Sequence, residues 1–294
     1  MENISEFLDF AIKIAKEAGS IQMKYFGNIS SLEKKSTNID LVTKADLESE
    51  NYLIKQIHKK YKNHSIIAEE SGLNKKNGNY TWVIDPLDGT TNFAHNLPIF
   101  AVSLGLVNKK NETVCAVVYN PAAKKCFYAQ QNRGSYLNGK PIKCTSSKTL
   151  SECLIVTGFP YLHDNKYDLS FEIFKRFYDL TRGLRRLGSA SLDLCFVAMG
   201  RFDGYYEFGL KTWDVCAGSL IVKEAGGLVT DWNNKKQPKN GKRILASNGK
   251  IHKEMINILN SEKEYQIFYN WIDFTSSSII PESESFTKKV FLLL

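Results

Sequence analysis

Apolar residues recur at intervals of three and four positions along several parts of the chain, a spacing that is typical of amphipathic helices. The first such stretch runs from Ile4 to Phe26 and ends at Gly27. Thr43 and Asp46 have the spacing of a capping box, which predicts a second helix behind them. Further helices are predicted over Leu169–Leu180, Ser189–Gly200, Val215–Ala225 and Ile251–Leu259.

Short apolar runs bounded by turn residues predict strands. Ser65–Ala68 and Trp82–Ile84 are the first of these runs, and a turn is predicted behind the second, at Pro86 and Gly89. The next three runs read as an antiparallel meander and cover Ile99–Val107, Thr113–Tyr119 and Lys125–Ala129. In the second half, strands alternate with helices and are predicted over Leu154–Thr157, Gly204–Phe208, Leu228–Thr230 and Ile244–Ala246.

This order of elements predicts a mixed α/β chain of two subdomains, with a boundary in the polar run Cys144–Glu152. We expect an N-terminal α+β subdomain over residues 1–146 and a C-terminal α/β subdomain over residues 147–262. Residues 263–294 form a tail with aromatic residues, a serine run and an apolar end, and its role is left open.

Composition narrows the class of protein. The chain has 294 residues, 43% of them hydrophobic, which is enough for a sizeable core. Its net charge is +8, but acidic and basic residues are interspersed, which favours solvated surfaces over a nucleic-acid stripe. Six cysteines without a CxxC pair indicate reduced thiols in a cytoplasmic protein. No signal peptide or long apolar span is visible, so we expect no membrane association.

Acidic residues stand at the ends of two predicted strands. Asp85 and Asp88 follow Trp82–Ile84, and Glu69 follows Ser65–Ala68. If these strands are neighbours, the acids share one pocket, which is favourable only with cations between them. Carboxylate and carbonyl oxygens suit hard cations such as Mg²⁺. The alternative is an Asx-type turn whose aspartates only bind local N–H groups.

Other polar residues also have two interpretations. Asp46 is explained by helix capping, although a carboxylate fixed there could also accept a hydrogen bond from a catalytic hydroxyl. Ser189 is a plausible N-cap, and a helix start preceded by Gly188 can bind anions or hydroxyls. Asp214 is explained by the helix dipole. The five histidines are scattered without paired spacing, which argues against a catalytic triad or a zinc site.

Several segments together resemble the inositol monophosphatase family, over roughly residues 1–260. They are Glu69-Glu70-Ser71, Asp85-Pro86-Leu87-Asp88-Gly89-Thr90-Thr91-Asn92, Trp213-Asp214-x-x-Ala217-Gly218 and Glu224-Ala225-Gly226-Gly227. The family's substrate-side segments are resembled by Arg185-Arg186-x-Gly188-Ser189-Ala190 and Gly204-x-x-Glu207. Both are closer in sequence to the bacterial members of the family. The resemblance implies an α/β (α+β) layered sandwich of two fused subdomains, with alternating helix and sheet layers.

The resemblance also implies roles for individual residues. Two or three Mg²⁺ ions would be ligated by Glu69, Asp85, the carbonyl of Leu87, Asp88 and Asp214. Thr90, oriented by Asp46, would help to deprotonate a water, and Glu69 would share this catalytic role. The substrate would be contacted by Leu87, Asp88, Gly89, Thr90, Gly188, Ser189, Ala190, Glu207 and Asp214. Glu70, which adjoins the ligand Glu69, would support the metal site, and Lys35 matches a basic position near it.

The implied activity is Mg²⁺-dependent hydrolysis of myo-inositol monophosphate by a lithium-sensitive, cytoplasmic homodimer. Related phosphatases of this fold act on fructose 1,6-bisphosphate, 3′-phosphoadenosine nucleotides or histidinol phosphate, and these substrates stay open. A different class stays open as well: a transcription- or ribosome-associated binding protein that retains the site, which the net charge of +8 permits. A small phosphorylated polyol is the favoured partner.

Overall fold

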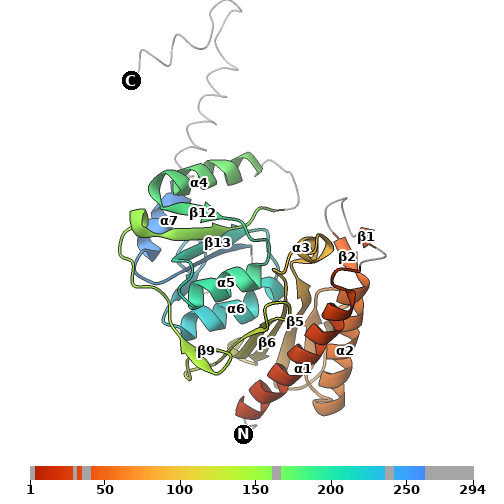
Figure 1. Cartoon of the computed structure of the whole chain (residues 1–294). Helices are drawn as coiled ribbons and strands as arrows, with labels where there is room; N and C mark the ends of the chain where they lie inside the picture. Colours follow the sequence, from red (N-terminus) through yellow and green to blue (C-terminus); the bar gives the residue numbers. More distant parts are fainter. Residues whose placement is uncertain (1–3, 29–31, 35–40, 161–166, 236–241, 262–294) are drawn as a thin grey trace, which may run out of the picture.

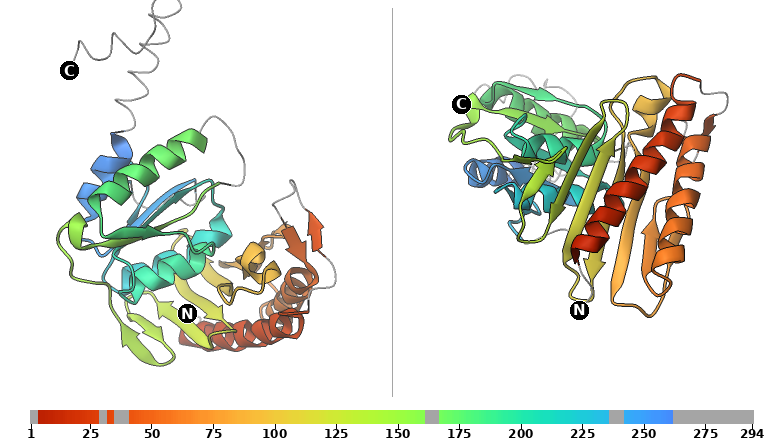
Figure 2. Two further views of the ribbon diagram at one scale, coloured as in Figure 1. Left: turned by 45° about the horizontal axis from the view of Figure 1, so that its top comes forward. Right: turned by 60° about the horizontal axis from the view of Figure 1, so that its bottom comes forward.

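Helices and sheets alternate in layers through the molecule (Figures 1 and 2). The computed structural model describes residues 4–28, 32–34, 41–160, 167–235 and 242–261. Helices α1 (Ile4–Tyr25) and α2 (Lys44–Lys60) cover one face of a large sheet, and α5 (Ala190–Ala198) and α6 (Thr212–Glu224) lie between this sheet and a smaller one. Helices α4 (Tyr167–Leu180) and α7 (His252–Asn260) cover the outer face of the smaller sheet. The expected layered α/β fold is confirmed.

The large sheet contains the predicted meander. In the described part of the chain it has eight strands, in the order β10-β9-β8-β7-β6-β5-β3-β4. Their bounds are β3 Ser65–Ala68, β4 Gly72–Asn74, β5 Tyr80–Asp88, β6 Ala101–Asn108, β7 Thr113–Asn120, β8 Lys125–Gln130, β9 Ser135–Leu137 and β10 Lys140–Ile142. Strands β3 and β5 pair in parallel, with Ala68 opposite Ile84, so the acids that follow these residues are neighbours, as expected.

Strand β5 corrects one local prediction. Pro86 does not end the strand, because β5 continues to Asp88. Its pairing with β6 shifts register between Asp85 and Asp88, and a bulge at this point accommodates a proline that has no N–H to donate. The chain turns only at Gly89, whose φ of 97° is in the left-handed region that favours glycine. The short helix α3 (Thr90–Ala94) follows directly.

The small sheet has five strands within the described residues, in the order β12-β11-β13-β15-β14. Their bounds are β11 Leu154–Thr157, β12 Gly183–Arg185, β13 Gly204–Phe208, β14 Leu228–Thr230 and β15 Arg243–Ser247. Strand β11 is parallel to β12 and β13, and β15 is antiparallel to β13 and β14. The sequence did not predict β12. The predicted division after residue 146 lies between β10 and the 3₁₀ helix η1 (Leu150–Glu152), and it stays a prediction.

Strands β1 (Leu32–Lys34) and β2 (Leu41–Thr43) pair beside the start of α2. Lys35 and the tail from residue 263 onward lie outside the described residues. Within the described residues, no helix has both the length and the apolar character that are needed to cross a membrane. All six cysteines are free, as the sequence predicts.

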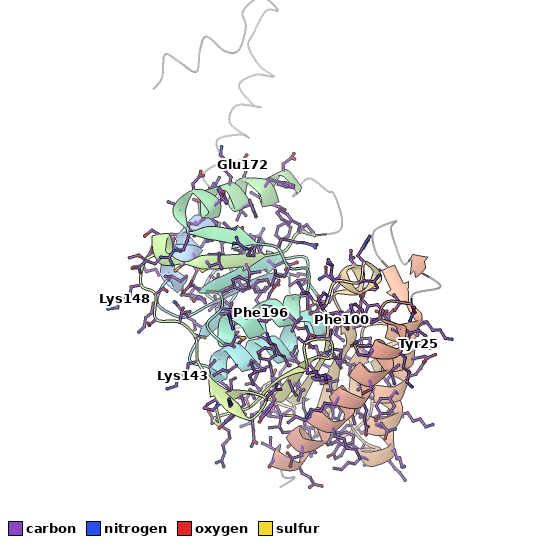
Figure 3. All side chains as sticks on the ribbon, viewed as in Figure 1. Tyr25, Phe100, Lys143, Lys148, Glu172 and Phe196 are labelled. Carbon is purple, nitrogen blue, oxygen red and sulfur yellow. The ribbon has the colours of Figure 1, made fainter. Side chains whose placement is uncertain are left out.

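The core follows the layers. One apolar cluster lies between α1, α2 and the large sheet, another surrounds α5 and α6, and a third lies beneath α4 and α7. Figure 3 labels the buried Phe100 and the half-buried Phe196, whereas Lys143, Lys148 and Glu172 project from the surface. Helices α5 and α6 are buried over most of their length, which holds their first turns firmly in place.

A buried histidine makes stability depend on pH. The two ring nitrogens of His252 lie 2.9 Å from Thr230 Oγ1 and 2.8 Å from Ser247 Oγ. Burial lowers the pKa of His252 from 6.5 to about 4. Between pH 6.5 and pH 4 only the unfolded chain binds this proton, so stability falls as the pH is lowered through this window.

We therefore expect the free energy of unfolding to fall by about 3 kcal/mol between neutral pH and pH 4 because of His252. Denaturant unfolding at a series of pH values measures this loss. His252→Gln should lose correspondingly less on acidification, because it has no proton to take up. Parallel pH profiles for the wild type and His252→Gln would contradict this account.

Candidate functional site

A cavity of about 110 Å³ opens where β5 ends and where α5 and α6 begin. The structure brings most of the predicted site residues to its wall. From the prediction these are Glu69, Asp85, Leu87, Asp88, Gly89, Thr90, Gly188, Ser189, Ala190, Glu207 and Asp214. Its wall also contains Thr91, Gly158, Phe159, Arg186 and Leu210. Segments that are far apart in the sequence therefore meet at one point between the two sheets.

Asp85 is the most deeply buried acid of the cavity wall, with 1% of its surface exposed. Its Oδ1 accepts a hydrogen bond from the N–H of Leu87 at 3.0 Å. Burial raises the pKa of Asp85 well above its ordinary value, and the charges of Glu69, Asp88 and Asp214 raise it further. The strand end thus concentrates negative charge, as the sequence predicted.

Asp88 links the large sheet to α5. Its Oδ2 accepts hydrogen bonds from Ser189 Oγ at 2.7 Å and from the N–H and Oγ of Ser191 at 2.7 and 2.5 Å. Its Oδ1 accepts the N–H of Ala190 at 3.2 Å. Burial raises the pKa of Asp88, and the bonds from Ser189 and Ser191 oppose this rise. Ser189 is the N-cap residue, but its hydroxyl serves Asp88 rather than its own helix.

Asp214 is held at the start of α6. Its Oδ2 accepts the N–H of Lys211 at 2.6 Å. Burial raises the pKa of Asp214, the Lys211 bond opposes this, and the charges of Asp88 and Glu69 add to the rise. Glu69, partly exposed at the end of β3, also faces the cavity. Asp214 therefore acts in helix capping and also contributes to the acidic wall.

The donor set fits a hard cation in its chemistry. Glu69, Asp85, Asp88 and Asp214 supply carboxylates, and Leu87 adds a carbonyl to the same wall. Within the part of the chain that the structure describes, no group of three or more His, Cys, Asp and Glu side chains is already arranged as a metal centre. Oxygen donors favour Mg²⁺ over softer metals. The assignment of these residues as metal ligands stays a prediction.

Thr90 and Asp46 meet across the chain as the resemblance implied. Thr90 Oγ1 lies 3.1 Å from Asp46 Oδ1 and also 3.1 Å from the carbonyl of Leu87. Asp46 is fully buried, and its Oδ2 accepts the N–H and O–H of Thr43 at 2.8 and 2.5 Å. The capping box is confirmed, and the second oxygen of the same carboxylate reaches the Thr90 hydroxyl.

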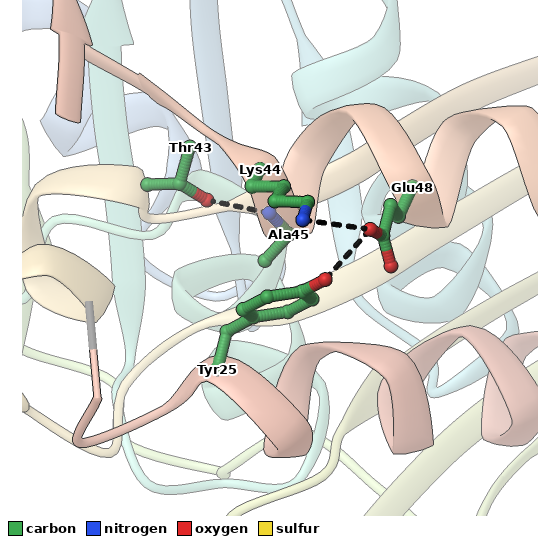
Figure 4. Close-up of polar contacts among 5 residues, drawn as sticks. All are labelled: Tyr25, Thr43, Lys44, Ala45 and Glu48. Atoms are coloured by element: carbon green, nitrogen blue, oxygen red, sulfur yellow. Dashed lines mark hydrogen bonds and ion pairs between the residues drawn. The ribbon is translucent and has the colours of Figure 1, made fainter. Parts of the chain in front are cut away.

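The start of α2 is fastened to the end of α1 (Figure 4). Tyr25 donates to Glu48 at 2.6 Å, and Lys44 lies 3.8 Å from the same carboxylate. Thr43 Oγ1 accepts the N–H of Ala45 at 3.1 Å. These contacts orient the first turn of α2, so the Asp46 carboxylate has little freedom to turn away from Thr90.

The opposite wall carries the predicted substrate side. Glu207 is 8% exposed, and its Oε2 accepts a hydrogen bond from Tyr205 at 2.6 Å. Burial raises the pKa of Glu207 to about 7, while the bond from Tyr205 and the charge of Arg186 oppose the rise. Asn92 Nδ2 holds the neighbouring loop by donating to the carbonyls of Leu187 at 2.7 Å and Ile99 at 2.8 Å.

Glu70, which was assigned a supporting role, is not among the residues that line the cavity. Glu70 donates its N–H to Glu50 at 2.9 Å, and Ser71 donates to the same carboxylate at 2.8 Å. Glu50 therefore orients the turn behind β3. Lys35 is not among the described residues.

Sequence reasoning gave no role to some residues that the structure places at the site. Ser191 binds Asp88, and Arg186, Gly158 and Phe159 line the cavity. Ser191 directly follows the quoted segment that ends at Ala190, and its hydroxyl is the signal that could have identified it. Gly158 directly follows the predicted strand Leu154–Thr157, the same kind of position that drew attention to Glu69.

Comparison with known proteins identifies the family of this chain. The model of the inositol monophosphatase family matches residues 3–264. The chain belongs to this family.

Individual relatives are similar over most of the chain. The putative Nus factor SuhB of Neisseria meningitidis serogroup B is 40% identical over 260 residues, covering 88% of this chain and 99% of the relative. Inositol-1-monophosphatase of Synechocystis is 39% identical over 264 residues, covering 90% of this chain and 92% of the relative. The crystal structure of extragenic suppressor protein SuhB from Bartonella henselae superposes with a TM-score of 0.82 at 32% identity, covering 86% and 98% of the two chains.

Charge crowding at Asp85 leads to a stability prediction. Because its pKa is raised in the fold, the stability that Asp85 contributes is present at low pH and is lost as the pH rises through the folded pKa. Asp85→Asn should therefore stabilise the metal-free protein at neutral pH, by on the order of 1 kcal/mol. Thermal unfolding with a chelator measures this gain.

The matched control is Asp179→Asn, which removes an exposed acid of α4 and should leave stability unchanged. In the same unfolding assay, added Mg²⁺ should stabilise the wild type more than it stabilises Asp85→Asn. A metal-free Asp85→Asn protein that melts below the wild type would refute the account of crowded charges.

Proposed function

We propose that the protein is a Mg²⁺-dependent phosphomonoesterase that hydrolyses myo-inositol monophosphate to inositol and phosphate. Membership of the family supports the reaction class. The observation that carries the proposal is the Thr90 hydroxyl, held by Asp46 at the edge of a cavity lined by acids. Phosphate-monoester hydrolysis has a very high barrier, and positioning and charge neutralisation are the main means of lowering it.

When bound, divalent cations would neutralise the phosphate and acidify the attacking water. Glu69, Asp85, Asp88, Asp214 and the Leu87 carbonyl would hold these cations. Thr90 would orient the water and accept its proton while passing its own hydroxyl proton to Asp46 Oδ1, which lies 3.1 Å away. Asp46 is fixed by Thr43, so it can hold this proton without moving.

The substrate would bridge the two walls. Backbone N–H groups of Gly89 and Thr90 would bind phosphate oxygens at the turn behind β5. Gly89 suits this place because a Cβ there would lie 2.8 Å from the carbonyl of Ile99. The polyol would face Gly188, Ser189, Ala190 and Glu207, and the Glu207 carboxylate would accept hydrogen bonds from ring hydroxyls.

The choice of a small polyol rests on this wall, and a substrate panel tests it. Inositol 1-phosphate, fructose 1,6-bisphosphate, a 3′-phosphoadenosine nucleotide and histidinol phosphate are compared by phosphate release with and without Mg²⁺. We expect the highest kcat/KM for inositol 1-phosphate, and no turnover with a chelator. Lithium inhibition and a homodimer in light scattering are further family expectations.

Variants at position 90 test the proton path. Thr90→Ala should lower kcat on the order of 100-fold, because the hydroxyl that links the water to Asp46 is gone. Thr90→Ser keeps the hydroxyl and should stay within a few-fold of the wild type. Steady-state kinetics on inositol 1-phosphate at saturating Mg²⁺ measures both. Equal kcat for Thr90→Ala and the wild type would remove Thr90 from the mechanism.

A second candidate is a Nus-factor role, because a relative at 40% identity has that name. The net charge of +8 is compatible with binding to nucleic-acid machinery. We expect such a role to appear as co-purification with RNA polymerase or ribosomal components that is lost at high salt. If the protein purifies at low salt without these partners, the Nus-factor role is rejected and the phosphatase is the one remaining proposal.

A further inference from the structure

Glu207 is held by a neighbour on its own strand. Tyr205 and Glu207 are two positions apart on β13, so their side chains share one face of the sheet. The Tyr205 hydroxyl donates to Glu207 Oε2 at 2.6 Å, and Tyr205 itself has no exposed surface. A buried phenol has few alternative rotamers, so this bond fixes where the carboxylate lies.

A glycine leaves room for the same carboxylate. Strand β11 pairs in parallel with β13, with Thr157 opposite Tyr206, so Gly158 comes beside Glu207. A Cβ at Gly158 would lie 2.2 Å from both carboxylate oxygens of Glu207. The backbone of Gly158 is not in the left-handed region, so the glycine is needed for space rather than for its conformational freedom.

From these two contacts we infer that Tyr205 and Gly158 are positioning residues, which hold the Glu207 carboxylate where it recognises the polyol part of the substrate. The Tyr205 hydroxyl fixes one oxygen, and Gly158, which follows the end of β11, leaves space for both oxygens. Arg186, on the same cavity wall, supplies the positive charge that favours an ionised Glu207. The inference rests on the proposed function, because it assigns Glu207 to the polyol.

The chain offers a matched control one residue away. Tyr206 is also buried, but it points to the other face of β13 and stacks on Phe177 with ring centroids 4.4 Å apart. Its hydroxyl has no hydrogen-bond partner among the described residues. Tyr206→Phe therefore removes the same atom from the same strand without touching Glu207.

The test compares two phosphomonoesters in the presence of Mg²⁺. Inositol 1-phosphate carries the polyol, whereas 4-nitrophenyl phosphate has no polyol hydroxyl groups that could donate hydrogen bonds to Glu207. Tyr205→Phe should raise KM for inositol 1-phosphate roughly 10-fold with kcat little changed, since a bond to a charged group is lost. Gly158→Ala should do the same by displacing the carboxylate. With 4-nitrophenyl phosphate Tyr205→Phe should change KM far less than with inositol 1-phosphate, and Tyr206→Phe should behave as the wild type with both.

Equal KM values for Tyr205→Phe and Tyr206→Phe, or losses of the same size with both phosphomonoesters, would overturn the inference. A wild type that hydrolyses neither compound would instead reject the proposed function. In that case a crystal structure of Tyr205→Phe still decides the positioning role. We expect the Glu207 carboxylate to leave its place beside Gly158, and an unchanged carboxylate would overturn the inference.

Discussion

The bond between Asp88 and the first turn of α5 is the interaction on which the rest of the site depends. It joins the end of β5 in the large sheet to a helix that begins about 100 positions later. The N–H groups of Ala190 and Ser191, together with two serine hydroxyls, compensate for burying a carboxylate. Together with the bond from Asn92 to the carbonyl of Leu187, this link makes the wall formed by the second half of the chain face the acids of the first half.

The same construction concentrates negative charge. Asp85, Asp88 and Asp214 each have a pKa above the ordinary value because they are buried, and neighbouring acids raise the pKa of Asp85 and Asp214 further. A fold selected only for stability would place apolar groups here. Keeping the acids favours a use for them, and a divalent cation is the partner that offsets both desolvation and mutual repulsion.

Periodicity and turn residues were sufficient to predict α1, α2, α4 and the meander, since each depends on local spacing. The neighbourhood of Glu69 and Asp85 was also predictable, because both follow strands. The passage of β5 through Pro86 was not, since a proline at a bulge and a proline at a turn look alike in sequence. Ser191 and Gly158 act on Asp88 and Glu207 across long sequence separations, so only tertiary pairing reveals their contacts.

Helix capping and the proposed roles in the site do not compete for these acids. Asp46 gives one oxygen to Thr43 at the start of α2 and the other to Thr90. Asp214 gives Oδ2 to the N–H of Lys211 and still lines the cavity. A helix start supplies N–H groups in fixed directions, so a carboxylate that uses one oxygen as a cap presents its second oxygen with little conformational freedom. The capping bond of each acid therefore also orients its carboxylate toward a site whose residues come from distant segments.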